Sequence, residues 1–132
     1  MPSQLISGLD HVQIEAPAGH EPQARQFYGD FLGLPELDKP EVLRPNGGVW
    51  FALPDGRQLH TGTVAAFVPR DKGHPCLRSD QLDALLERAT RLQIAFEPDT
   101  RLAPLRRVYF QDPFGNRLEV VEGAHPAVPL SG

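Results

Sequence analysis

Hydrophobic and polar residues alternate between positions 8 and 16, a pattern typical of a strand with one polar face. His11, Gln13 and Glu15 share the polar side of this predicted strand, and Val12 and Ile14 share the other. Successive side chains of a strand point to opposite faces. The three polar residues are therefore expected to line one surface while the aliphatic pair packs beneath it.

Helical spacing follows this strand. Apolar positions that recur every three or four residues predict a helix that stops at Gly33: Ala24, Phe27, Tyr28, Phe31 and Leu32. Three strand-like segments come next, and sequences that favour turns separate them. They lie near 41–45, 48–53 and 57–64. The first half of the chain thus predicts one strand, one helix and three further strands.

The same order of elements then begins again. Residues 73–78 predict a strand, and Asp80 is a suitable N-cap for the amphipathic helix that follows. The apolar positions of that helix are Leu82, Leu85, Leu86, Ala89 and Leu92. Further strands are predicted near 93–97, 106–112 and 117–122. The residues from Gly123 onward predict a terminal tail.

Two eleven-residue segments support a division into repeated modules. The segment from Trp50 to His60 aligns without a gap with the segment from Tyr109 to Glu119, and four of the eleven positions are identical. Differences in spacing elsewhere fall in predicted loops, where insertions are tolerated. We therefore predict one α+β domain spanning 1–132, made of two βαβββ modules at about 5–64 and 67–122 and a tail at 123–132.

Four potential metal ligands occupy equivalent positions in the two predicted modules. In the register of the repeat, His11 corresponds to His74, and His60 corresponds to Glu119. Imidazole nitrogen and carboxylate oxygen are the usual protein ligands of zinc, iron, nickel and manganese. The repeat thus predicts a single divalent ion, one of these four metals, bound by all four residues.

Three motifs in the chain resemble a known family. They are Asp10-His11-Val12 in the first strand, residues 27–34 at the end of the first helix, and residues 108–119, where an Asp-Pro-x-Gly-Asn turn precedes a strand that carries Glu. From about 8 to 122 the sequence is similar to the glyoxalase, fosfomycin-resistance and extradiol-dioxygenase superfamily, the vicinal oxygen chelate superfamily. The resemblance implies a cupped mixed sheet around a metal site, helices on the outside, and a homodimer.

The resemblance also implies roles for individual residues. His11, His74 and Glu119 match the family's metal ligands. The fourth position carries a carboxylate in glyoxalase I, whereas this chain has His60, which argues against lactoylglutathione lyase activity. A tyrosine in the last motif reaches the substrate in fosfomycin-resistance members, so Tyr109, together with Glu119, is predicted to be catalytic. The predicted substrate-binding residues are Tyr109, Trp50, Arg117 and Gln58; Arg117 is expected either to hold an anionic substrate or to neutralise Glu122.

Composition and charge limit the kinds of partner that the protein is expected to bind. The net charge of −4 and the lack of a long basic run argue against a nucleic-acid partner. No apolar segment is long enough to span a membrane, and the N-terminus does not resemble a secretion signal, so a cytoplasmic protein with no membrane partner is expected. Cys76 is the single cysteine, which excludes an intrachain disulfide and a cysteine-based zinc cluster. His20 and His125 lie in turn-like sequence and are expected to be exposed.

These observations predict a metal-dependent lyase, isomerase or transferase that chelates a small oxygenated substrate molecule at the divalent ion. A ring-cleaving extradiol-type dioxygenase is an alternative, and it would require Fe(II) or Mn(II). A non-enzymatic small-molecule or drug-binding resistance protein is a second alternative. Such proteins share the fold and lack the ligand set, so intact His11, His74 and Glu119 argue against it.

Overall fold

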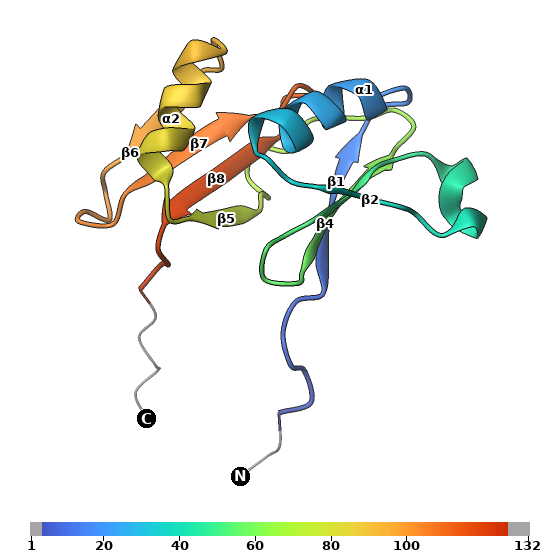
Figure 1. Ribbon diagram of the computed structural model, residues 1–132, viewed down its shortest axis with the longest axis horizontal. Coiled ribbons are helices and arrows are strands. Elements are labelled where there is room, and N and C mark those ends of the chain that lie inside the picture. The colour runs from blue at the N-terminus through green and yellow to red at the C-terminus, as the bar shows by residue number, and fades with distance from the viewer. Residues whose placement is uncertain (1–3, 127–132) are drawn as a thin grey trace. The chain divides into compact units, whose positions relative to one another are not determined.

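The computed structural model describes residues 4–126, and the chain divides into two compact units, Met1–Val68 (unit 1) and Pro69–Gly132 (unit 2). Each unit contains one four-stranded sheet with its own helix (Figure 1). The predicted α+β fold with two βαβββ modules is confirmed by this order of elements. Of the predicted tail at 123–132, residues 127–132 lie outside the described residues.

Unit 1 begins with a strand and a short helix that changes from α to π geometry. Its elements are β1 (His11–Ala16), α1 (Glu21–Ala24), the π-helix η1 (Arg25–Phe31), β2 (Glu36–Leu37), the 3-10 helix η2 (Glu41–Asn46), β3 (Trp50–Ala52) and β4 (Gln58–Thr63). The strand order is β1-β4-β3-β2, with β1 parallel to β4 and the other pairs antiparallel. Tyr28 of η1 packs against Phe51 of β3, with ring centroids 5.9 Å apart, so the predicted helix covers the apolar face of this sheet.

Unit 2 repeats this topology. Its elements are β5 (Cys76–Ser79), α2 (Leu82–Arg91), β6 (Phe96–Asp99), β7 (Arg107–Gln111) and β8 (Arg117–Glu122), and its strand order is β5-β8-β7-β6. Strand β5 runs parallel to β8, and the other two pairs are antiparallel. Leu82 and Ala89 of α2 are buried, which places the apolar side of this helix against the unit's core.

Strand register agrees with the alignment of the repeat. His60 on β4 lies beside Gln13 of β1 and Trp50 of β3. Glu119 on β8 lies at the equivalent place, beside Cys76 of β5 and Tyr109 of β7. His60 and Glu119 therefore occupy the same position in their two sheets.

Three local predictions were wrong. The segment near 41–45, predicted as a strand, is the 3-10 helix η2; Pro45 lies inside it and has no N–H to offer a sheet ladder. The predicted N-cap of α2 was Asp80, but the N-cap is Gln81. The backbone N–H of Gln81 donates a hydrogen bond to the hydroxyl oxygen of Ser79. Strand β5 begins at Cys76, so His74 lies in the segment just before the strand rather than within it.

His20 is buried, contrary to the expectation that it would be exposed, and it is only 1% accessible. Its Nδ1–H donates to the carbonyl of Pro17 at 2.8 Å, and its Nε2 forms a hydrogen bond with the hydroxyl of Thr61 at 2.7 Å. The Thr61 oxygen in turn accepts the N–H of Val49 at 2.9 Å. This buried chain of hydrogen bonds connects the turn before α1 to β4 and to the start of β3.

The Asp112–Asn116 turn between β7 and β8 explains the Asp-Pro-x-Gly-Asn motif. The buried Asp112 carboxylate accepts the backbone N–H groups of Phe114 and Asn116, both at 2.9 Å, and the Asn116 side-chain amide at 3.0 Å. Asn116 then accepts the N–H of Arg70 at 2.9 Å. The motif therefore fixes the hairpin that presents Glu119 and ties it to the segment leading into β5.

The longest helix of the described residues is α2, with ten residues. Across residues 4–126, none of the helices combines the length and the apolar character needed to cross a membrane.

Gly48, just before β3, provides a test of how tightly unit 1 is packed. Its φ is +93°, and a methyl group added there would lie 2.1 Å from the carbonyl oxygen of Thr61. Gly48→Ala is expected to lower the free energy of unfolding by roughly 2–5 kcal/mol, because backbone strain of about 1–2 kcal/mol adds to overpacking of about 1–3 kcal/mol. Urea denaturation measures this change.

Gly56→Ala is the matched control. Gly56 has a similar φ of +90°, but no atom lies within 4 Å of the added methyl group. Its loss is expected to be only the strain part, about 1–2 kcal/mol. Equal losses in the two variants would contradict the steric explanation.

Candidate functional site

The predicted ligands of unit 1, His11 and His60, lie on neighbouring strands with their rings stacked. Their centroids are 4.3 Å apart and their planes differ by 21°. Trp50 of β3 stacks on the other side of His60, with centroids 4.0 Å apart and planes within 1°. His60 is therefore held in a three-ring stack, which fixes the plane of its imidazole.

One ring nitrogen of each histidine in this pair is held by an oxygen acceptor. His60 Nε2–H donates to the side-chain oxygen of Gln58 at 2.8 Å, and His11 Nδ1–H donates to the carboxylate of Asp10 at 2.9 Å. Metal-binding histidines typically donate their second N–H in this way, which leaves the other nitrogen as the ligand atom. Burial, and then the nearby His11, lower the pKa of His60, which favours the neutral form that metals bind.

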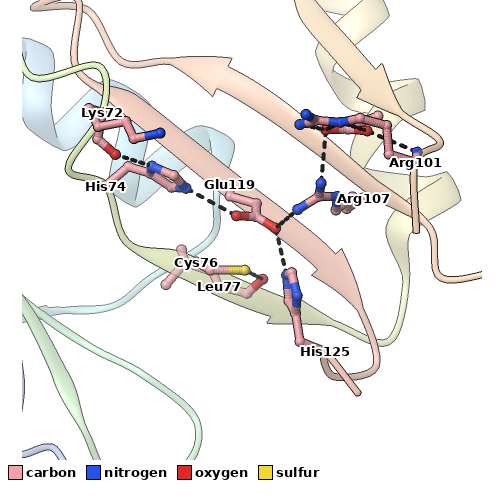
Figure 2. Close-up of polar contacts among 9 residues, drawn as sticks. Lys72, His74, Cys76, Leu77, Arg101, Arg107, Glu119 and His125 are labelled. Carbon is pink, nitrogen blue, oxygen red and sulfur yellow. Dashed lines mark hydrogen bonds and ion pairs between the residues drawn. The ribbon is translucent and has the colours of Figure 1, made fainter. Parts of the chain in front are cut away.

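The predicted ligands of unit 2, His74 and Glu119, are also in contact. His74 Nε2 lies 3.0 Å from Glu119 Oε1, while the other carboxylate oxygen is 2.7 Å from Nε2 of His125 and 3.2 Å from the guanidinium of Arg107 (Figure 2). Arg107 also donates to Asp99 at 2.9 Å. Glu119 is only 4% accessible, so it is a buried carboxylate surrounded by nitrogen donors.

The charge of Glu119 is maintained by these neighbours. Burial by itself would raise the pKa of Glu119, but hydrogen bonds from His125, His74 and Arg107 lower that pKa to about 2. The carboxylate is therefore anionic at neutral pH, which is the form that binds a cation.

The surroundings of His74 fit a metal ligand. Its Nδ1–H donates to the carbonyl oxygen of Lys72 at 2.9 Å, while its Nε2 faces the Glu119 carboxylate. Nε2 is the nitrogen that would bind a divalent cation together with that carboxylate. His74, like His11 and His60, thus has one ring nitrogen held by an oxygen acceptor.

Tyr109 lies directly opposite Glu119 on β7 and is surrounded by cationic side chains. The guanidinium of Arg117 lies 5.0 Å from the centre of its ring and that of Arg107 lies 5.7 Å away, while His74 meets the ring edge-on at 5.8 Å. Glu122 pairs with Arg106 at 3.6 Å, which favours the interpretation that Arg117 serves an anionic ligand rather than Glu122.

A cavity of about 230 Å³ opens beside Trp50 in unit 1. Its lining combines amide, ammonium, hydroxyl and aromatic groups from the sheet and from the segment around η2: Gln13, Lys39, Leu43, Asn46, Gly47, Trp50, Thr61, Gly62 and Thr63. Lys39 donates to the carbonyl oxygen of Gly47, which holds its ammonium group at the cavity. Such a lining suits a small oxygenated molecule.

The structure brings the predicted site residues together in two groups, each within its own unit. Unit 1 groups His11, His60, Trp50 and Gln58, and unit 2 groups His74, Glu119, Tyr109 and Arg117. Gln58, predicted to bind substrate, contacts His60.

Sequence reasoning missed His125, which was expected only to be exposed. It is in part exposed, but it also contacts Glu119 from the segment after β8. Cys76, beside Glu119 on β5, is an exposed residue that forms no disulfide. Partial burial of its sulfur and then the neighbouring carboxylate raise the pKa of the thiol to about 12. In the sequence, His125 was signalled only by its position six residues after Glu119. Cys76 was signalled by its position two residues after His74, which places both on the same face of a strand.

Solved structures with similar folds come from several bacteria. A structure from Bacillus anthracis that is described as belonging to the glyoxalase family is 36% identical, with a TM-score of 0.89, and the match covers 93% of this chain and 100% of that chain. Lactoylglutathione lyase from Agrobacterium tumefaciens is 25% identical, with a TM-score of 0.73 and coverage of 91% and 96%. A mutant of the fosfomycin resistance protein FosX from Listeria monocytogenes, complexed with Mn(II) and 1S,2S-dihydroxypropylphosphonic acid, is 18% identical, with a TM-score of 0.69 and coverage of 91% and 95%. This last likeness shows the fold alone.

The chain matches a known family over most of its length. No curated protein matches the chain at a significant level. Residues 8–120 match the family described as the glyoxalase/bleomycin resistance protein/dioxygenase superfamily. The chain therefore belongs to this superfamily, as its motifs, its repeated βαβββ topology and its likeness to the solved structures all indicate.

Proposed function

We propose that this protein is a metal-dependent lyase, isomerase or transferase that chelates a small oxygenated substrate at one divalent ion, zinc, iron, nickel or manganese. The proposed ligands are His11, His60, His74 and Glu119. One observation carries the proposal: each of the three histidines has one ring nitrogen held by an oxygen acceptor, as metal-binding histidines do, and the second nitrogen of His74 already faces the Glu119 carboxylate.

The charge of this ligand set suggests the kind of substrate. Three neutral imidazoles and one carboxylate would leave a divalent ion with a net charge of about +1, which suits an anionic oxygen. When bound, the ion would act as a Lewis acid that stabilises negative charge developing on substrate oxygens. Likeness to a lactoylglutathione lyase supports lyase chemistry as a class, while His60 favours a different substrate.

The residues of the chain itself would bind and orient the substrate. The Arg117 guanidinium is exposed above Tyr109 and would pair with an anionic group of the substrate. The Tyr109 hydroxyl would donate a hydrogen bond to a substrate oxygen. Within unit 1, the flat face of Trp50 would offer a stacking surface to a substrate group.

Metal content is the first test of the proposal. Protein purified without added metal is expected to contain close to one equivalent of a divalent ion per chain, measured by elemental analysis. Glu119→Gln keeps the shape of the side chain but removes its charge, so this variant is expected to lose at least about 90% of the metal. His60→Ala is expected to lose a similar share.

Two outcomes would count against the proposal in different ways. Full metal content in His60→Ala would show that His60 contacts the substrate or another ligand rather than the ion. The absence of metal from the wild-type protein, even after incubation with each of the four ions, would refute the metalloenzyme.

Gln58 provides a test of the positioning of His60. Gln58→Ala removes the oxygen that accepts the His60 N–H, so metal affinity is expected to fall about 10–100-fold. Gln58→Glu restores an acceptor and is expected to recover most of that affinity. Isothermal titration with Zn²⁺ measures both variants. Equal affinity in Gln58→Ala and the wild type would show that the hydrogen bond does not orient the ligand.

A homodimer in the cytoplasm is also proposed, from the family resemblance and the composition. The two pairs of ligands would then come from one chain or from two. Sedimentation velocity at micromolar concentration is expected to give a single species of twice the chain mass of 14.6 kDa. A monomer at every concentration tested would contradict the dimer and leave the ligand assignment to the metal measurements.

A further inference from the structure

Two side chains that can bind metals, those of Cys76 and His125, lie close to the Glu119 carboxylate. The sulfur of Cys76, a carboxylate oxygen of Glu119 and a ring nitrogen of His125 all lie within 4.8 Å of one another (Figure 2). Glu119 is buried, whereas Cys76 and His125 are exposed, so the cluster is open to ions in solvent. Thiolate, carboxylate and imidazole are all ligands of zinc, cobalt and nickel.

The arrangement follows from the fold of unit 2 alone. The parallel pairing of β5 with β8 places Cys76 directly beside Glu119. The turn after β8 then brings His125 back to Glu119 Oε2 at 2.7 Å, while His74 contacts the other oxygen, Oε1, at 3.0 Å. The carboxylate thus has two sides, one shared with His74 and one shared with Cys76 and His125.

The spacing is close to that of a coordinated ion. Zinc bonds of about 2.0–2.3 Å in a tetrahedron separate neighbouring ligand atoms by about 3.3–3.8 Å. The three atoms here are separated by at most 4.8 Å, so a shortening of about 1 Å would be enough. Rotation of the two exposed side chains can supply this movement without a change in the buried Glu119.

A bound divalent ion would keep less positive charge in a ligand set that includes a thiolate. Arg107 lies 3.2 Å from Glu119 and would repel an ion that kept a positive charge, although Asp99, at 2.9 Å, offsets part of this repulsion. A thiolate and a carboxylate together neutralise a divalent ion. Three neutral histidines and one carboxylate would leave it with a net charge of about +1.

We propose that Cys76, Glu119 and His125 form a second site for a soft divalent cation such as Zn²⁺ or Co²⁺, complete within unit 2. Binding forms a metal–sulfur bond, and the thiol proton leaves to solvent. The inference shares Glu119 with the proposed function but does not need His11 or His60. Because the two ligand sets share one carboxylate, they would compete for it.

Cobalt spectroscopy on the full-length protein tests this site, since a Co²⁺–thiolate bond gives a charge-transfer band in the near ultraviolet. The wild type is expected to show this band as Co²⁺ is added. Cys76→Ser is expected to lose it completely, and His125→Ala is expected to bind Co²⁺ at least about tenfold more weakly. His11→Ala is the control, and the band is expected to persist in it or to grow, because the competing ligand set is removed.

The outcomes separate this inference from the proposed function. Co²⁺ bound without a thiolate band, and lost in His11→Ala, would overturn the inference and leave the proposed function standing. A thiolate band that disappears in His11→Ala would also overturn it, because the cysteine would then belong to the four-residue site. Failure of the wild type and of every variant to bind Co²⁺ would overturn both this inference and the proposed function. A band retained in His11→Ala and absent in Cys76→Ser would support the inference whatever the four-residue site does.

Discussion

The buried charge of Glu119 is the constraint on which unit 2 depends. An isolated carboxylate at this depth would be costly to bury, so the surrounding elements must each supply a positive or donating group. Strand β7 provides Arg107, the segment before β5 provides His74, and the segment after β8 provides His125. The turn that begins at Asp112 holds the hairpin that carries Glu119. The fold of unit 2 is therefore organised around one buried anion.

Unit 1 uses the same position of its sheet for a different purpose. His60 occupies the place of Glu119, but a neutral ring needs contact with other rings rather than compensation of charge. Trp50 and His11 therefore stack on its two faces, and Gln58 accepts its N–H. Duplication of one βαβββ module thus provides two equivalent positions, and the neighbouring side chains decide which chemistry each position supports.

The alternation of polar and apolar residues predicted which side chains of β1, β4, β7 and β8 share a face of their sheet. It could do so because a period of two depends only on neighbours in the chain. The candidate ligands were chosen from the polar faces. Three features depend on contacts that no local pattern encodes. The short apolar run at 41–45 suits a strand or a helical turn equally, and Pro45 excludes a ladder bond only at its own position. Burial of His20 requires the hydroxyl of Thr61, 41 residues away. His125 returns to Glu119 only because the chain turns back after β8.

The substitution of histidine for a carboxylate at position 60 is coupled to Trp50. A carboxylate placed between an indole and an imidazole would lose both stacking contacts, and it would face the negative surface of the tryptophan ring without a compensating donor. The lowered pKa of His60 shows that this environment, through burial first, favours an uncharged group. His60 and Trp50 therefore act as one unit, and a chain with Trp50 is better suited to a neutral nitrogen ligand than to the carboxylate of glyoxalase I.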